Sequence, residues 1–188
     1  MLKRRLNEKT DYRQRLALLK SGLPRLVIRK TNNKILIQIV EFIRSGDKTL
    51  TEASSLDLAS LGWKGHSGSV PAAYLAGMLA ATKAIKHGVK EAIADIGLQY
   101  SRKGVAIYAA IKGAKDAGLN ISAGEAFPDD ARIRGEHIAQ YAKLLKSKNK
   151  AAYEKQFSSY LKSGFNPEDI AKNFDEVKLA IKNAKGNE

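Results

Sequence analysis

The sequence predicts an α/β protein whose mixed sheet begins as an antiparallel hairpin and continues through parallel β-α-β-α-β crossovers. Three observations predict this fold class. Two neighbouring segments rich in β-branched residues are joined by a short polar turn, two helical segments then alternate with short apolar runs, and the remainder reads as helices alone. We therefore divide the chain into a basic amino-terminal arm (1–24), an α/β body (25–125) and a helical carboxy-terminal extension (126–188).

The composition is that of a folded and strongly basic protein. The 188 residues are 44% hydrophobic and carry a formal net charge of +14 at pH 7, and a chain of this length can bury a core. The absence of cysteine excludes disulfides and thiolate metal sites. No apolar run approaches the roughly 20 residues that span a bilayer, and no apolar segment follows the basic start as in a secretory signal. We expect a cytoplasmic protein without a membrane partner.

The first thirty residues carry most of this charge, because ten basic residues stand against two acidic ones and give the segment +8. Lysine and arginine neutralise phosphates and release condensed counterions, so such a segment can hold nucleic acid before any base is read. A disordered solubilising tail is the alternative.

Within this arm, residues 11–21 read as a short helix that ends near Gly22, with Pro24 as a second stop. The helix has too few apolar positions to be stable alone, so we expect it to dock on the body or on RNA. Tyr12 is able to stack on a base, although packing against the nearby leucines is the more common role of such a residue.

Residues 25–30 and 34–42 predict a β-hairpin. They are joined through a turn that contains Asn32 and Asn33, and asparagine tolerates the left-handed conformation that tight hairpin turns need. A further turn signal over residues 45–48 predicts that 49–54 return as a third antiparallel strand.

Alternation along the first strand places Leu26 and Ile28 on one face and leaves Arg25 and Arg29 on the other. One face is then core, and the opposite face displays arginines to solvent or phosphate.

The segment after the third strand, residues 56–68, is a loop punctuated by three glycines. Neither a Walker spacing nor a nucleotide fingerprint is present, so we do not expect a nucleotide site. Lys64 and His66 could contact an RNA backbone there, since glycines let the main chain approach phosphate closely. A simple surface turn is an equally good reading.

The rest of the body alternates helices and strands. Residues 71–87 and 102–117 read as helices, and 91–97 and 119–122 as strands. Their short connections imply parallel crossovers, and the many alanines of the first helix allow close approach to the sheet. In the extension, residues 132–146, 151–162 and 167–185 read as three helices whose apolar stripes favour burial.

The sequence contains few groups of residues that are candidates for catalysis. The three histidines are scattered without metal-ligand spacing. Asp95 ends a buried strand, where carboxylates can bind Mg²⁺, but a capping or turn role is favoured because nothing in the spacing demands that other acids converge on it. The candidates for such convergence are Asp57, Glu125, Asp129 and Asp130. We predict no catalytic residues, no metal, no cofactor and no small-molecule substrate, so function has to be argued from binding.

Several separated blocks occur in a recognisable order: KTDY, RLVIRKTNNKILIQIV, KTLTEAS, PAAYLAGMLAATKA, IADIG, KGVAIYAAIKGAKDAGLNI and YEKQFSSYLKSG. Together they closely resemble the large-subunit ribosomal protein L-eighteen family in its archaeal form, whose eukaryotic relative is ribosomal protein L-five. The resemblance runs over essentially the whole chain and includes the helical extension that the shorter bacterial form lacks.

The resemblance implies a structural, non-catalytic protein of the central protuberance. Such a protein binds 5S ribosomal RNA and attaches it to the large-subunit ribosomal RNA, beside a neighbouring 5S-binding ribosomal protein of the universal L-five family. The RNA-binding residues carried over from the family are Lys3, Arg4, Arg5, Lys9, Tyr12, Arg13, Arg15, Lys20, Arg25, Arg29, Lys30, Asn32 and Asn33, with Trp63, Lys64 and His66 as a weaker set. A generic basic RNA- or DNA-binding protein and, less favoured, a Mg²⁺-dependent nuclease remain as alternatives.

Overall fold

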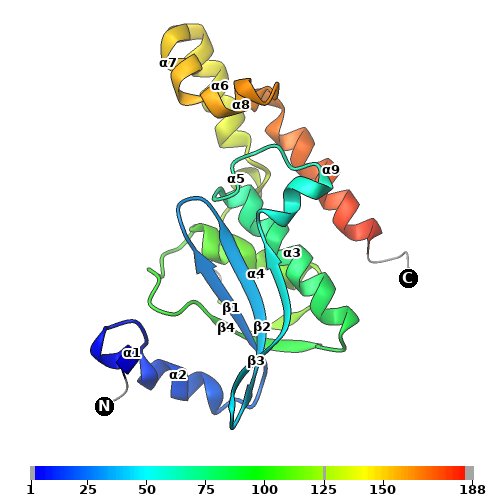
Figure 1. The fold of residues 1–188 in the computed structure, drawn as a ribbon. Coiled ribbons are helices and arrows are strands. Elements are labelled where there is room, and N and C mark those ends of the chain that lie inside the picture. The colour runs from blue at the N-terminus through cyan, green and yellow to red at the C-terminus, as the bar shows by residue number, and fades with distance from the viewer. Residues whose placement is uncertain (1–2, 125, 185–188) are drawn as a thin grey trace.

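A computed structural model describes residues 3–124 and 126–184, and within these residues the strands form one five-stranded sheet (Figure 1). The strand order is β3-β2-β1-β4-β5. β1 pairs antiparallel with β2 and parallel with β4. The strands are β1 (Arg25–Lys30), β2 (Ile35–Ile43), β3 (Gly46–Ser54), β4 (Glu91–Asp95) and β5 (Asn120–Ile121). The predicted mixed α/β fold class is confirmed.

Some predictions fall outside the described residues. Met1 and Leu2 of the predicted arm, the candidate carboxylate Glu125, and Lys185 at the end of the last predicted helix are among them.

The β1–β2 hairpin forms where it was predicted. Cross-strand partners such as Ile28 and Ile37 are both fully buried, because the alternating apolar residues of the two strands face the same side. The loop is closed by Thr31, whose N–H donates to the carbonyl of Lys34 over 2.8 Å. Asn32 and Asn33 both have negative φ, so the proposed left-handed asparagine turn is wrong. The loop is long enough for ordinary backbone angles, and Thr31 closes it.

The β2–β3 turn lies earlier than predicted. The chain reverses over Arg44 and Ser45, with Ile43 already paired to Gly46, so β3 begins before the predicted turn region has ended. Two-residue turns match the natural twist of paired strands, and Gly46 takes a φ of 146° that suits glycine. As a result, Asp47 belongs to a strand.

The two crossover helices, α3 (Val70–Lys86) and α4 (Ala106–Asp116), pack against each other as closely as backbones allow. A Cβ placed on Gly77 would lie 2.0 Å from the carbonyl oxygen of Ala110, and one on Gly113 would lie 2.0 Å from that of Tyr74. The small residues of α3 therefore serve the contact with α4 as well as the predicted approach to the sheet. α4 starts four residues later than predicted, which leaves residues 96–105 as a loop.

The carboxy-terminal helices form two groups. The last helix, α9 (Ile170–Asn183), buries Phe174 and Val177 in the main core. Helices α6 (Glu136–Lys148), α7 (Lys150–Gln156) and α8 (Ser158–Lys162) instead enclose a small cluster of Ala142, Tyr153 and Phe157. In Figure 1 these three helices stand beyond the sheet. The two helices predicted over 132–146 and 151–162 are each interrupted, giving α5 (Asp130–Arg134) before α6 and separating α7 from α8.

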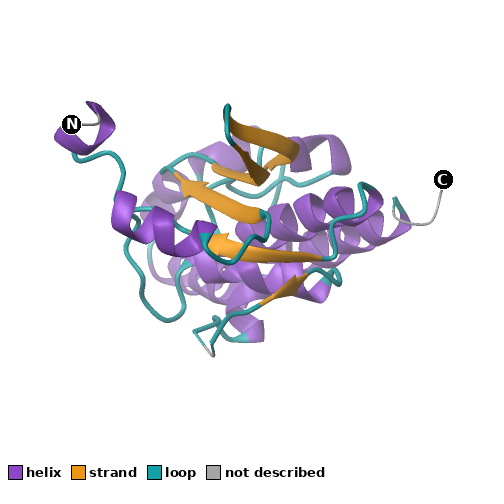
Figure 2. Cartoon of the chain, turned by 90° about the horizontal axis from the view of Figure 1, so that it is seen from below, coloured by secondary structure: helices purple, strands orange, loops and turns teal. Residues whose placement is uncertain are grey.

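The described ends of the chain lie on opposite sides of the molecule. The short helix α1 (Lys3–Leu6) stands at one side and the end of α9 at the other, in both views (Figures 1 and 2). Among the described helices, none combines the length and the apolar character needed to cross a membrane.

Candidate nucleic-acid interface

The amino-terminal arm presents its basic residues to solvent. Its second helix, α2 (Tyr12–Leu19), begins at Asp11, whose carboxylate accepts the N–H groups of Arg13 and Gln14 over 2.9 and 3.1 Å. No residue of α2 is buried, in agreement with the low apolar content read from the sequence. The exposed cations of the arm are Lys3, Arg4, Arg5, Lys9, Arg13 and Lys20. Tyr12 is half-buried.

The arm is tied to the body by five charged residues, which we call the arginine–aspartate network. Arg25 contacts both of its carboxylates, with Nη1 at 2.8 Å from Asp95 and Nη2 at 2.7 Å from Asp47. Arg29 adds a contact of 3.0 Å to Asp95. Arg15 of α2 binds the other carboxylate, Asp47, over 2.8 Å. The network thus joins the arm, the β2–β3 hairpin and the paired strands β1 and β4.

Local backbone geometry holds this network in place. Asp95 ends β4 and also accepts the N–H of Gly97 over 3.0 Å. Gly97 has a φ of 60°, and a Cβ there would lie 2.9 Å from the Arg29 guanidinium carbon. Only glycine combines that conformation with that approach.

The pKa of Asp95 lies below its ordinary value. Burial alone would raise this pKa, but the hydrogen bonds and charges of Arg29 and then Arg25 outweigh it. Its carboxylate is therefore an ion-pair partner rather than an unclaimed metal ligand. In the part of the chain that the structure describes, no group of three or more acidic, histidine or cysteine residues could hold a metal ion.

Arg25 is not displayed on the surface as the alternation suggested. Its side chain is only 4% exposed, whereas that of Arg29 is 42% exposed. At Arg25, the outer face of β1 is covered by the carboxylates of Asp47 from β3 and Asp95 from β4. The alternation of residues along β1 indicates the face on which Arg25 lies, but not whether other strands cover that face. This placement argues against a direct contact of Arg25 with RNA.

The glycine loop rests on the tip of the β1–β2 hairpin and on the carboxy-terminal helices. A Cβ on Gly68 would lie 2.2 Å from the carbonyl oxygen of Asn32. The backbone N–H of Lys64 donates to Asn173 over 3.0 Å, and that of His66 donates to the Tyr160 hydroxyl over 2.9 Å. The Lys64 and His66 side chains remain exposed.

Trp63, from the weaker set of candidates, is buried in the main core. A contact of its ring with RNA is therefore disfavoured.

The structure thus divides the predicted residues between the two ends of β1, which six extended residues place about 20 Å apart. The arm lies at the end where β1 starts, and the hairpin tip with Asn32 and Asn33 lies at the other end, together with the glycine loop (Figure 1). The network runs along β1 from Arg25 at the first end to Arg29, which precedes Lys30 at the second.

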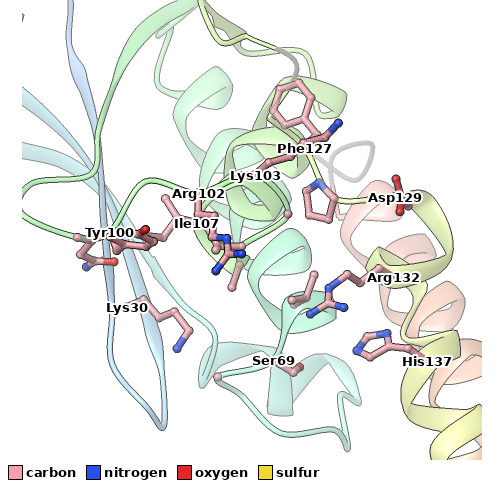
Figure 3. A pocket seen from close by; sticks show the side chains of 17 residues that line it. Lys30, Ser69, Tyr100, Arg102, Lys103, Ile107, Phe127, Asp129, Arg132 and His137 are labelled. Atoms are coloured by element: carbon pink, nitrogen blue, oxygen red, sulfur yellow. The ribbon is translucent and has the colours of Figure 1, made fainter.

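Beside the hairpin tip is a cleft of about 950 Å³, which we call the basic cleft (Figure 3). Its walls come from Lys30, from the starts of α3 and α4, from the loop before α4, and from α5 and α6. In Figure 3 the side chains of Lys30, Arg102 and Arg132 are directed toward the same space.

Sequence reasoning missed the cleft residues Arg102, Lys103 and Arg132. For Arg102 and Lys103 the available signal was a basic pair two residues before a helix whose first turn contains no acidic residue.

Part of the chain matches a known family. Residues 1–92 match the family described as ribosomal large subunit proteins 60S L5, and 50S L18. The matched range includes the arm, the first three strands, the glycine loop and α3, and it ends within β4.

Proposed function

The chain belongs to this family of large-subunit ribosomal proteins, and from that premise we propose that it binds 5S ribosomal RNA and attaches it to the large-subunit RNA in the central protuberance. The proposal includes a neighbouring 5S-binding ribosomal protein of the universal L-five family as a partner, and an archaeal type for the chain. Family membership itself supports a structural rather than enzymatic role, in the large subunit of the cytoplasmic ribosome.

The observation that carries the proposal is that the family match covers the arm, where six basic side chains are exposed. Paired RNA hides its base edges in a deep groove, so a protein for a folded RNA reads its shape and backbone. Exposed lysines and arginines on short helices suit that task, because each can neutralise a phosphate.

The residues that we propose to contact RNA fall into two groups. From the arm they are Lys3, Arg4, Arg5, Lys9, Tyr12, Arg13, Arg15 and Lys20, and from the strands, hairpin tip and glycine loop they are Arg29, Lys30, Asn32, Asn33, Lys64 and His66. Arg25 is given a positioning role instead, since it holds Asp47 and, through it, Arg15 of the arm.

The alternatives are weaker. The Mg²⁺-dependent nuclease requires Asp95 as a metal ligand, yet Arg25 and Arg29 occupy both of its oxygens. A generic basic binder explains the charge but leaves the ordered sequence blocks unexplained.

The test is a comparison of 5S RNA with an unrelated folded RNA of similar length, over a salt titration, using the full chain. We expect a strong preference for 5S RNA. In the Arg5→Ala/Lys9→Ala/Arg13→Ala variant, the slope of log affinity against log salt should be shallower by roughly 0.7 to 0.9 for each lost phosphate contact.

The matched control is Lys143→Ala/Lys155→Ala/Lys162→Ala, which removes three exposed charges from the carboxy-terminal helices and should leave the slope unchanged. Equal affinity of the unmodified chain for both RNAs would overturn 5S recognition and leave a generic binder.

A further inference from the structure

We propose that the basic cleft binds one unpaired nucleotide of ribosomal RNA, at a place separate from the arm. The phosphates would lie between Lys30, Arg102 and Arg132, and the base would stack on Tyr100. This inference rests on the proposed function for the identity of the RNA, and Lys30 is the one residue that the cleft shares with the RNA-contacting residues proposed above.

Three of the four cations of the cleft have side chains that the fold does not use, whereas the fourth, Lys30, donates to the carbonyl of Thr31 over 3.2 Å. Arg102, Lys103 and Arg132 are exposed, and none of their side chains forms an ion pair or a hydrogen bond with the residues that the structure describes. Arg134, on the same helix as Arg132, shows the contrast, because it contacts Asp175 at 2.7 Å and Glu136 at 3.7 Å.

The charge of the cleft is therefore available to a ligand. Asp129 is the single acidic residue on its described wall, and it lies apart from Arg102 in Figure 3. Guanidinium groups bind phosphate oxygens in a planar, two-pronged geometry, which makes unpaired arginines well suited to a phosphodiester.

Backbone groups add to this positive potential. Ala106 and Ile107, in the first turn of α4, line the cleft, and no side chain caps that helix start. Ser69 and Val70 at the start of α3 line the same cleft, but the Ser69 hydroxyl caps that helix by accepting the N–H of Ala72, so the free N–H groups come mainly from α4. Free N–H groups at helix starts favour anions, so they support the arginines without being the basis of the site.

The cleft also contains the features expected of a site for a base. Tyr100 is 77% exposed, and Ile107 and Phe127 contribute apolar surface to the cleft lining. Unpaired bases in RNA complexes stack on exposed aromatic rings. The Nδ1 atom of His137 is buried without a hydrogen-bond partner among the described residues, and it offers a polar contact for a ribose hydroxyl or a base edge.

The combination favours an unpaired nucleotide over other anions. A lone phosphate would leave the aromatic wall and most of the 950 Å³ unused. An RNA duplex presents its bases inside the helix, where Tyr100 cannot stack on them.

The test uses the full chain with 5S RNA and, in separate arms, with large-subunit RNA, so that the source of the nucleotide is identified. Arg102→Ala/Arg132→Ala should weaken binding to one of the two RNAs and lower its salt slope by roughly 0.7 for each phosphate contact on a single strand. Arg134→Ala is the matched control and should leave affinity and slope unchanged.

A second pair of variants tests the base. Tyr100→Ala should weaken binding to the same RNA by roughly tenfold or more, while Tyr100→Phe, which keeps the ring, should bind like the unmodified chain. Photo-crosslinking of RNA that contains 4-thiouridine should give a crosslinked peptide that includes Tyr100.

Unchanged affinity and slope of the arginine double variant for both RNAs, with no crosslink in the cleft, would overturn the inference and favour an acidic protein segment as the occupant. This failure is distinct from failure of the proposed function. Loss of 5S preference in the unmodified chain overturns 5S recognition, whereas a retained preference with unaffected cleft variants overturns the cleft alone.

Discussion

The arginine–aspartate network and the basic cleft use the same residue type in opposite ways. In the network, Arg25 is buried against Asp47 and Asp95, and its charge is compensated inside the protein. In the cleft, Arg102 and Arg132 lie on the surface around an open space and have no carboxylate partner within the described residues.

The difference shows that the count of positive residues along a segment does not measure its capacity to bind RNA. The first thirty residues are the most basic segment of the sequence, yet three of their arginines are already ion-paired with Asp47 or Asp95. The cations of the cleft come from positions that are far apart in the sequence, so the local density of charge along the chain does not identify them. Where the carboxylates lie decides which arginines are available.

The largest expected effect is the loss of the aspartate at the centre of the network. Asp95→Asn would leave the buried Arg25 guanidinium without one of its charged partners, and removing one member of a buried ion pair costs about 3–5 kcal/mol. Chemical denaturation at pH 7 checks this value. A loss below about 1 kcal/mol would mean that the network contributes no more than a surface ion pair.

Acidification should weaken the same interaction. The pKa of Asp95 is lower in the folded chain than in the unfolded chain, where it is about 3.9, so its contribution is present above that value and is lost as pH falls through the folded pKa. The unmodified protein should therefore lose stability between about pH 5 and pH 2 more steeply than Asp95→Asn. Parallel stability profiles of the two proteins would contradict this assignment.

A smaller effect is expected at the edge of the network. Asp47 is 29% exposed and holds both Arg15 and Arg25. Because solvent screens this carboxylate, Asp47→Asn should cost only about 1 kcal/mol of stability. It should also release α2, which hydrogen exchange over residues 12–19 would detect as faster exchange. Unchanged exchange there would show that Arg15 does not hold the arm.

The smallest effect on stability is expected in the cleft. Arg102→Ala/Arg132→Ala removes two exposed side chains that have no described partners, so the free energy of unfolding should change by less than about 0.5 kcal/mol. Thermal denaturation, carried out beside the RNA-binding measurements, checks this. A loss of 2 kcal/mol or more, on the order of a core defect, would place the cleft arginines among the structural residues and erase the contrast with the network.

Much of the fold could be predicted because the signals were local. The β-branched runs predicted β1 and β2, and the helix predicted over 71–87 agrees with α3 to within one residue at each end. Boundaries failed where neighbouring strands decide them. β3 extends to Gly46 because its pairing with β2 continues to the turn. The residue types around Gly46 do not indicate that the strand begins there.

The candidate site was harder to predict for a related reason. The exposed arm could be identified from charge alone. The burial of Arg25 depends on Asp95, which lies 70 residues further along the chain, and the cleft depends on the fold placing Arg102 and Arg132 opposite Lys30. Contacts between distant segments leave no periodic trace in the sequence.

The pairing of β1 with β4 also determines when the sheet can be completed during synthesis of the chain. When the ribosome has made the hairpin and β3, the other edge of β1 stays open until β4 follows, and at about 5–20 residues per second this takes several seconds. An open strand edge is a template for wrong pairing, and charged side chains on such an edge hinder it. Arg25 and Arg29 are the arginines on that open strand, and both gain an ion-pair partner only when Asp95 has been synthesised.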